Sequence, residues 1–273
     1  MRFRRLNRWA LLVTALCLLL FCSAFAIWSG AVWPKADGDR VVSDDSLKID
    51  YSHAKQGYIM IKGAKTSKKQ KLQIKFGSNK LTYDINSNGT YEVFPLQFGS
   101  GSYTIVLYKN TSGKQYAQIG SRKISVTLDD EQAAFLVPNQ YVNYSKDDPI
   151  VALSDEICRN CTTDAEKLQA VRDYFKKNFH FDYVRMMMLK SGDLPDINYV
   201  LKNKMGVCQD LSAVACAILR TQGVKTRFCI GYFGSTYHAW LSVFIDGKEV
   251  IYDPTYELGG ISKNGTYQEE RFY

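Results

Sequence analysis

Polar and apolar residues alternate in short runs between residues 47 and 128. Turn residues separate the runs, and Asn88-Gly89 and Ser112-Gly113 are typical of tight turns. Because a period of two places successive side chains on opposite faces of a strand, this pattern predicts strands rather than helices. Strands that recur at such spacing are typical of a small antiparallel β-sandwich. The clearest runs are 58–62, 71–76, 103–108 and 123–127.

After residue 128 the pattern changes to helices followed by strands. Thr163 and Glu166 have the spacing of a capping box, and apolar residues then recur three and four positions apart, which predicts a helix over about 164–178. A second helix is predicted to begin near Cys208 and to end at Gly223. Three strand-like runs follow, at 226–233, 238–245 and 249–256.

The last two strand-like runs bring a histidine and an aspartate together. Asp246-Gly247 between the runs predicts a two-residue hairpin turn that pairs position 245 with 248, and therefore 240 with 253. Asp253 would then lie on the same sheet face as His238, diagonally across the strand pair and within side-chain reach. A three-residue turn would place Asp253 on the opposite face, so this prediction depends on the register.

Cys208 stands where a nucleophilic cysteine is expected. It opens the second predicted helix, where unpaired N–H groups and the helix dipole favour a thiolate over a thiol. A Cys–His–Asp triad is therefore predicted: Cys208 as the nucleophile, His238 as base and then acid, and Asp253 to orient the imidazole. Taken singly, each residue also has a structural interpretation, as a buried cysteine, a core histidine or a turn aspartate.

Two further residues of the same types are predicted to have packing roles. Cys216 follows Cys208 by two turns, inside the helix, where a buried and inert thiol is expected. His180 lies between Phe179 and Phe181, which predicts a packed histidine.

Three blocks of sequence resemble the core of the transglutaminase-like superfamily. The blocks are Gly-Val-Cys-Gln-Asp at 206–210, His-Ala-Trp at 238–240 and Tyr-Asp-Pro-Thr at 252–255, within a match over roughly 160–256. The resemblance implies an α+β, papain-like cysteine protease fold, with N-terminal helices and a nucleophile helix packed on an antiparallel sheet. It also implies acyl transfer from an amide through a thioester on the triad of Cys208, His238 and Asp253.

The superfamily includes cross-linking transglutaminases, peptidases, amidases and catalytically silent members, so the resemblance does not specify one reaction. The oxyanion of the intermediate also needs donors. The backbone N–H of Cys208 is one candidate, and the side chain of Asn203 or Tyr183 is considered for a second.

The N-terminus has the pattern of an export signal. Four arginines within residues 1–8 precede an apolar run at 11–21 and then Ala24-Phe25-Ala26, which predicts a signal peptide cleaved after Ala26. A retained membrane anchor over 9–33 and a lipid anchor at Cys22 are the alternatives. Each of the three predicts an extracytoplasmic protein, secreted or anchored to the membrane.

The predicted organisation of the chain has four parts. They are a signal peptide or membrane anchor (1–26), a linker (27–46), a small all-β sandwich domain (47–128) and a transglutaminase-like domain (129–273).

The 273-residue chain has 35 Lys and Arg against 27 Asp and Glu, and this excess is unevenly distributed. Residues 47–128 hold 13 basic and 3 acidic residues, whereas 129–273 hold 16 basic and 20 acidic residues. The basic β-domain could bind an anionic cell-envelope polymer or a membrane surface. Alternatively, its lysines protect exposed strand edges from aggregation. Nucleic acid is not expected as a partner because the predicted location is outside the cytosol.

Five cysteines follow the N-terminal segment, and an odd number leaves at least one free thiol. Cys158 and Cys161 predict either a local disulfide or two unrelated thiols, since the further ligands of a zinc site are missing. No cofactor and no metal site are predicted.

The sequence thus predicts an exported thiol enzyme that acts on the amides of a peptide or protein substrate. Hydrolysis is favoured over cross-linking, because water is the default acceptor and no amine-acceptor site is recognisable. The alternative is a catalytically silent envelope-binding or scaffolding module that uses the basic β-domain.

Overall fold

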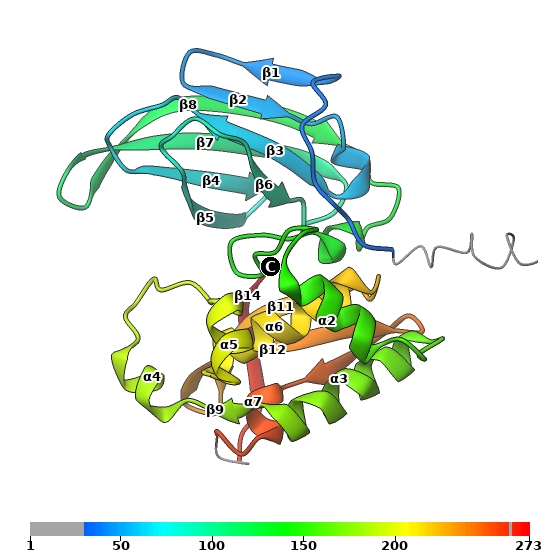
Figure 1. Ribbon diagram of the computed structural model, residues 1–273. Helices are drawn as coiled ribbons and strands as arrows, with labels where there is room; N and C mark the ends of the chain where they lie inside the picture. The colour runs from blue at the N-terminus through cyan, green and yellow to red at the C-terminus, as the bar shows by residue number, and fades with distance from the viewer. Residues whose placement is uncertain (1–29, 262–263) are drawn as a thin grey trace, which may run out of the picture.

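The structure is a computed structural model that describes residues 30–261 and 264–273. The predicted signal peptide or anchor at 1–26 lies outside these residues. Within the described ranges, no helix is both long and apolar enough to span a membrane. Strands form one part of the molecule and a mixed helix and strand layer forms the other (Figure 1).

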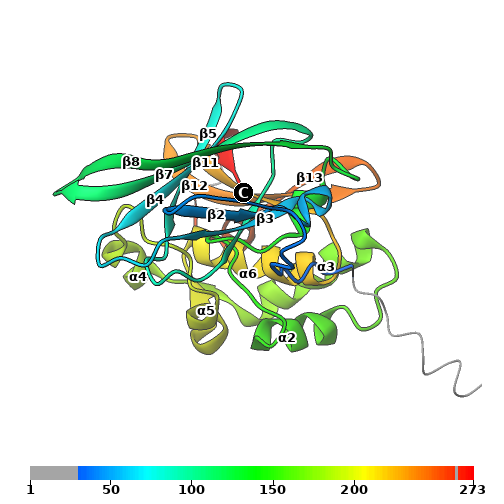
Figure 2. The same ribbon diagram turned by 90° about the horizontal axis from the view of Figure 1, so that it is seen from above.

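The strand part consists of two four-stranded antiparallel sheets, which confirms the predicted β-domain. Leu47 and Ile59 from one sheet and Leu72 and Ile105 from the other belong to one buried core. Seen from above, β7 and β8 form a long hairpin (Figure 2). The first sheet has the order β1 (Val41–Ser43), β2 (Leu47–Asp50), β3 (Tyr58–Gly63), β6 (Glu92–Pro95), with the short helix η1 (Ala54–Gln56) between β2 and β3. The second has the order β5 (Asn79–Ile85), β4 (Gln70–Phe76), β7 (Gly101–Ser112), β8 (Gln115–Val126).

The segment predicted as a linker, 27–46, is not free of structure over its described part. Val41–Ser43 is a strand that pairs with β2. The N–H of Gly38 donates to a carboxylate oxygen of buried Asp50 at 2.6 Å. Part of the predicted linker thus pairs with the first sheet, because β2 offers unpaired backbone groups that a neighbouring segment can satisfy.

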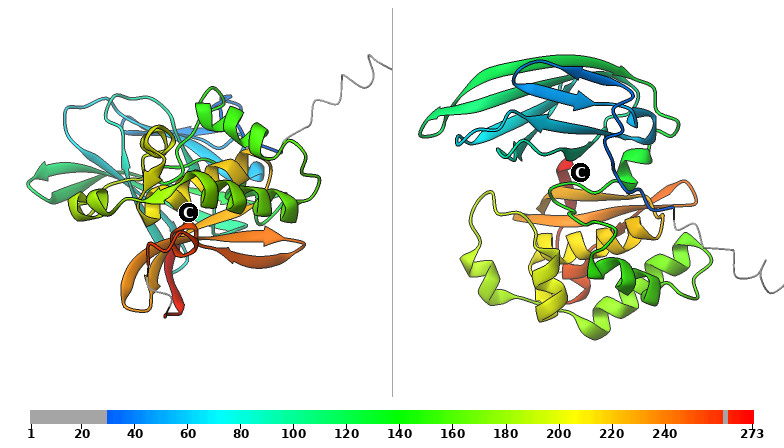
Figure 3. Two further views of the ribbon diagram at one scale, coloured as in Figure 1. Left: turned by 60° about the horizontal axis from the view of Figure 1, so that its bottom comes forward. Right: turned by 45° about the horizontal axis from the view of Figure 1, so that its top comes forward.

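The second part is built around one buried helix and one antiparallel sheet. The sheet has the order β13-β12-β11-β14, and Figure 3 shows helix α6 (yellow) lying along β11 and β12 (orange). Every residue of α6 from Asp210 to Thr221 is buried. The helices are η2 (Ala133–Leu136), α2 (Pro149–Ile157), α3 (Asp164–Asn178), α4 (Tyr183–Met188), α5 (Ile197–Asn203), α6 (Cys208–Thr221) and α7 (Pro254–Glu257). The strands are β9 (His180–Phe181), β10 (Met205–Gly206), β11 (Thr226–Phe233), β12 (Thr236–Ile245), β13 (Lys248–Tyr252) and β14 (Tyr267–Phe272).

The predicted helices and the hairpin are confirmed, with one error at the end of the last strand. Ile245 pairs with Lys248, as the two-residue turn requires. The predicted strand 249–256 ends instead at Tyr252, because Pro254 has no N–H for the sheet and begins α7. Asp253 caps that helix by accepting the N–H of Tyr256 at 3.0 Å.

Buried contacts between the two parts fix their relative placement. Gln97 of the β-domain donates to the carbonyl of Phe272, at the end of β14, at 3.2 Å. The ring of Tyr273 meets the ring of Tyr83 edge to face, with centroids 5.8 Å apart. The predicted boundary at 128/129 falls in the segment between β8 and α2 and stays a prediction.

Candidate active site

Cys208 is the first residue of α6 and is half-buried. Buried Val207, in extended conformation, leads into the helix and donates its N–H to Asp210 at 3.3 Å. The Cys208 side chain lines a cavity of about 500 Å³. The predicted nucleophile therefore stands at a helix start with access to a cavity.

His238 lies on β12 and connects the other two predicted residues. Its side chain is 2% exposed, and its Nε2 lies 2.7 Å from Oδ2 of Asp253. The Cys208 side chain also interacts electrostatically with the ring, and since Nε2 is engaged with Asp253, Nδ1 is the nitrogen left to face the sulfur. Burial alone would lower the pKa of His238, but its interactions with Asp253 and Cys208 outweigh burial and raise the pKa to about 9.

Asp253 lies behind His238, and its side chain is 3% exposed. Besides His238, its Oδ2 accepts the hydroxyl of Tyr267 at 3.0 Å. Burial and the negative charge of Asp253 raise the pKa of Tyr267 well above its usual range, so the hydroxyl stays protonated and donates. Sequence reasoning missed Tyr267, because it lies on β14, outside the three resembling blocks, and no local pattern marks it.

A buried ion pair supports the start of α6. The side chain of Asp210 is fully buried and accepts from Nε of Arg185 at 2.5 Å and from Nη2 at 3.0 Å. Asp210 also accepts the N–H of Asp196 at 3.1 Å. These contacts join α4 and the segment before α5 to the first turn of α6. Only Asp210 carried a signal in the sequence, as an acid in the first turn of a predicted helix.

The cavity beside Cys208 has two different walls. Met186 and Leu189, from α4 and the residue after it, form an apolar wall. Tyr237 and Arg271, from β12 and β14, form a polar wall in which the guanidinium donates to the tyrosine hydroxyl.

Comparison with known proteins identifies this part of the chain. A family model described as "Transglutaminase-like superfamily" matches residues 151–254. Residues 151–254 form a transglutaminase-like domain. The mixed α+β fold around α6 and the four-stranded sheet belongs to this domain.

Individual relatives are distant. The uncharacterized protein YebA of Bacillus subtilis (strain 168) is 21% identical over an alignment of 201 positions, which covers 64% of this chain and 27% of that protein. The chain thus spans about a quarter of the length of this curated relative.

Two solved structures are similar at low identity. One is a Cytophaga hutchinsonii protein described as a candidate cysteine protease, with a TM-score of 0.41, 17% identity, and coverage of 79% of this chain and 68% of that chain. The other is the periplasmic domain of TgpA from Pseudomonas aeruginosa, with a TM-score of 0.39, 12% identity, and coverage of 84% and 76%.

The two side chains considered as oxyanion donors do not line the cavity of the transglutaminase-like domain. Asn203 donates its side-chain amide to the carbonyl of Tyr199 at 2.9 Å, and Tyr183 is 59% exposed and packs against Phe181. Both expectations are wrong, because these side chains belong to the ends of α5 and α4. The donors that the geometry offers are the backbone N–H groups of the first turn of α6, which have no partner within the helix.

The remaining cysteines of the described chain have structural surroundings. Cys216 is fully buried, as predicted, and donates to the carbonyl of Thr226 at 3.6 Å. Burial raises its pKa to about 11. Cys158 and Cys161 are both free thiols, so of the two predicted alternatives the local disulfide is not the one present. Among the described residues, no group of three or more His, Cys, Asp and Glu side chains could hold a metal ion.

His180 does not have the packing role that was predicted for it. Its side chain is exposed, whereas Phe179 is fully buried. The two flanking phenylalanines turn inward while the short strand β9 directs His180 outward, because neighbours in an extended segment point to opposite sides.

Proposed function

We propose that the transglutaminase-like domain is a thiol enzyme that transfers the acyl group of a peptide or isopeptide amide through Cys208, with water as the favoured acceptor. The single observation that carries the proposal is the position of His238. Its buried ring hydrogen-bonds Asp253 and interacts electrostatically with Cys208, and both His238 and Cys208 line a cavity.

In the acylation step, Sγ of Cys208, its proton held by His238, attacks the carbonyl carbon of the substrate amide. The new C–S bond forms as the carbonyl π electrons move to oxygen, where the free N–H groups of the α6 first turn stabilise the negative charge. The C–N bond then breaks, and the imidazolium of His238 gives its proton to the leaving amine. The product of this step is a thioester on Cys208.

In the second step, water attacks the thioester while neutral His238 takes its proton. Collapse of the intermediate breaks the C–S bond, releases a carboxylic acid and leaves the Cys208 thiolate beside protonated His238, which restores the starting ion pair. A primary amine in place of water would give a new amide, which is the cross-linking outcome.

Asp253 and Tyr267 would set the orientation and charge of His238. The carboxylate fixes Nε2 as the donor to Asp253, which leaves Nδ1 to exchange protons with sulfur and substrate. Because the pKa of His238 is raised to about 9, the imidazolium is the dominant form near neutral pH and is ready to protonate the leaving amine.

A generic acyl donor tests this proposal without knowledge of the natural substrate. With p-nitrophenyl acetate, we expect a burst of p-nitrophenolate equal to the enzyme concentration, an acetyl adduct on the peptide that contains Cys208, and then slow release of acetate. Added glycine methyl ester reports the acceptor: acetate as the main product supports hydrolysis, and acetylated amine supports transfer. Acetylation spread over all thiols, with no burst, contradicts the proposal.

We further propose an extracytoplasmic location, secreted or membrane-anchored, on the basis of the basic and apolar pattern of residues 1–26. A fusion of this segment to a reporter enzyme that is active only outside the cytosol tests it: reporter activity is expected, and activity confined to the cytosol would contradict the proposal.

The basic β-domain supports a second candidate function, binding to an anionic polymer or membrane surface. Lys65, Lys68 and Lys69 are exposed in the segment between β3 and β4, and no ion pair involves them within the described residues. Because such contacts are screened by salt, binding to polyphosphate or to phosphatidylglycerol vesicles should weaken steeply as salt rises and survive Cys208→Ala. Absence of binding at low salt would exclude this role.

A further inference from the structure

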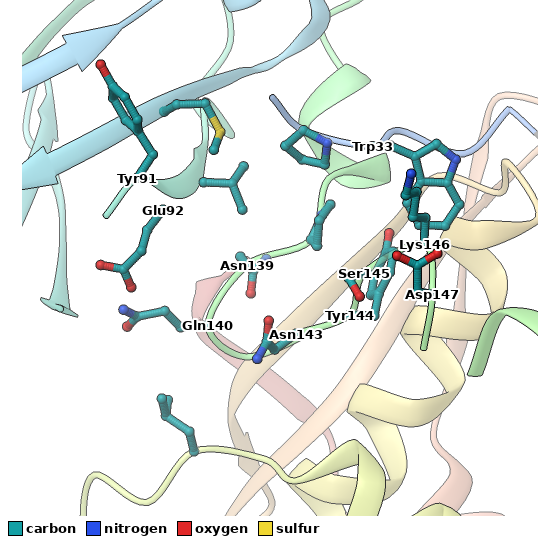
Figure 4. Close-up of a pocket in the computed structure, with 15 residues that line it drawn as sticks. Trp33, Tyr91, Glu92, Asn139, Gln140, Asn143, Tyr144, Ser145, Lys146 and Asp147 are labelled. Atoms are coloured by element: carbon teal, nitrogen blue, oxygen red, sulfur yellow. The ribbon is translucent and has the colours of Figure 1, made fainter. Parts of the chain in front are cut away.

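A second cavity, of about 610 Å³, lies between the β-domain and the transglutaminase-like domain. We call it the interdomain cleft, and Figure 4 shows side chains from several parts of the chain around it. Trp33 comes from the N-terminal segment, Tyr91 and Glu92 from the start of β6, and Asn139 and Asn143 from the segment between β8 and α2. None of the residues lining the interdomain cleft lines the cavity of Cys208.

A buried amide without a partner distinguishes the cleft from an ordinary gap between domains. Asn139 is 3% exposed, and its Oδ1 accepts the N–H groups of Tyr141 at 2.9 Å and Val142 at 3.1 Å. These two hydrogen bonds identify Oδ1 as the amide atom that faces the backbone N–H groups. Nδ2 is left buried, and residues 30–261 and 264–273 offer it no hydrogen-bond partner. An unsatisfied buried donor costs about 1–3 kcal/mol, so a ligand oxygen at this position would be stabilised.

Aromatic rings and planar polar groups surround that amide. Trp33 is 37% exposed and meets the buried ring of Tyr144 edge to face at 6.1 Å, which holds the indole while leaving part of it free. Glu92 uses Oε1 to accept from the backbone and side chain of Asn86, and no bond occupies Oε2. The exposed side chain of Asn143 supplies both a donor and an acceptor. Such a site suits a ligand ring with apolar C–H faces and hydroxyl groups around its edge. The C–H faces can stack on the aromatic side chains, and the hydroxyl groups can hydrogen-bond to the neighbouring donors and acceptors.

The charge of the cleft argues for an uncharged ligand. Its ionisable lining consists of Glu92, Asp147 and Lys146, so it holds more acid than base. An anionic polymer would be repelled here, unlike at the exposed lysines of the β-domain. The volume lies within the range of about 300–1,000 Å³ that is typical of small-molecule sites.

The interdomain cleft is also preformed. Nη1 of buried Arg220 donates at 2.5 Å to the carbonyl of Val137, next to the cleft residues 138 and 139. Gln97 and Phe272 join the two domains on another side. Since these contacts fix both walls, little ordering would oppose binding.

We propose that the interdomain cleft binds a neutral oligosaccharide, with the Trp33 and Tyr91 rings against sugar faces and Nδ2 of Asn139 donating to a sugar oxygen. This site is separate from the proposed acyl-transfer chemistry and does not depend on it.

Titration calorimetry of the full chain tests the proposal. The probes are chitotetraose and cellotetraose, which separate N-acetylated from plain glucose units, with polygalacturonate as the anionic comparison. We expect heat of binding with one or both neutral probes and none with polygalacturonate. If neither neutral probe gives heat of binding, the cleft holds only solvent and the proposal is overturned.

Variants locate the binding. Asn139→Asp keeps the acceptor for the N–H groups of Tyr141 and Val142 but removes the donor, and Trp33→Ala removes one stacking face. Each is expected to weaken binding at least about tenfold, which is the effect of one lost good contact. Tyr183→Ala removes a more exposed ring outside the cleft and should leave the affinity unchanged. Because Trp33 is partly exposed, its variant should fold even if Asn139→Asp does not, and full affinity in Trp33→Ala overturns the proposal.

An additional readout separates this site from the proposed enzyme activity. Trp33→Ala should retain the full p-nitrophenyl acetate burst, and Cys208→Ala should retain full oligosaccharide affinity. Loss of the oligosaccharide site therefore leaves the acyl-transfer proposal standing, and the reverse also holds.

Discussion

The two thiols of helix α6 differ in position, burial and neighbouring groups. Cys208 opens the helix, is half-buried at a cavity and contacts His238, whereas Cys216 lies two turns later with no exposed surface and only a carbonyl as partner. Burial raises the pKa of Cys216 to about 11, so it stays protonated and inert. A cysteine on this helix is therefore suited to catalysis by its position at the helix start and by its neighbour, not by residue type.

The buried charges of α6 show the same contrast. Asp210, in the first turn, pairs with Arg185 of α4, beside the cavity. Arg220, in the last turn, donates only to backbone carbonyls, those of Val137, Thr226 and Tyr273. The start of the helix thus supports the candidate active site, and its end connects the segment before α2, the start of β11 and the C-terminal residue.

The largest expected effect comes from substituting the two cysteines one at a time. Cys208→Ala should lower the rate of p-nitrophenyl ester turnover by about 10⁴-fold or more, because no other group can form the thioester. Cys216→Ala removes a similar volume and should leave the rate within about twofold, since its thiol touches no substrate. Stopped-flow absorbance measures both. Equal losses in the two variants would remove the distinction between the two positions.

The next effect concerns stability at the other end of the helix. Arg220→Met leaves buried carbonyls without donors and should lower the free energy of unfolding by about 3–5 kcal/mol. Arg122→Met breaks a partly exposed pair with Asp44 and should cost about 0–1 kcal/mol. Urea unfolding followed by circular dichroism gives both values. A small loss for Arg220→Met would mean that these hydrogen bonds contribute little to the stability of the fold around α6.

The fold was predictable where local patterns control it, and the same holds for much of the candidate site. The Asp246-Gly247 turn sets the register that brings Asp253 to His238, and the capping box begins α3 at Asp164. Tyr267 and Arg185 were not predictable, because each reaches its partner through tertiary packing, which produces no periodic pattern in the sequence. Trp33 belonged to a segment with no pattern, and its role becomes visible only once the two domains form a cleft around it.

The pKa of His238 gives a prediction of intermediate size. NMR titration should place the midpoint of the His238 ring near pH 9 in the native protein and at a clearly lower pH in Asp253→Asn. Because the native pKa is raised, the stabilising contribution of the protonated ring is complete below pH 6.5 and is lost as the pH rises through about 9. The unfolding free energy should therefore fall over this interval, less so in Asp253→Asn. An unchanged midpoint in the variant would contradict the role of Asp253.

The smallest expected effect separates two tyrosines at Asp253. Tyr267→Phe removes the hydroxyl that donates to Oδ2 and should lower turnover several-fold, about 1 kcal/mol in the barrier. Tyr256→Phe is the matched control, because Tyr256 contacts Asp253 through its backbone N–H, which the substitution keeps. Turnover rates of the two variants at pH 7 measure the difference. Identical rates would show that the Tyr267 hydroxyl has only a structural role.

The most direct measurement of the central claim, that His238 activates Cys208, is a map of iodoacetamide alkylation over the five cysteines described. In the native protein at neutral pH, Cys208 should be modified far faster than Cys158, Cys161, Cys216 and Cys229, and faster than in a denatured control. In His238→Gln this advantage should disappear. Equal and slow modification of Cys208 in the native and denatured protein, with no dependence on His238, would contradict the account.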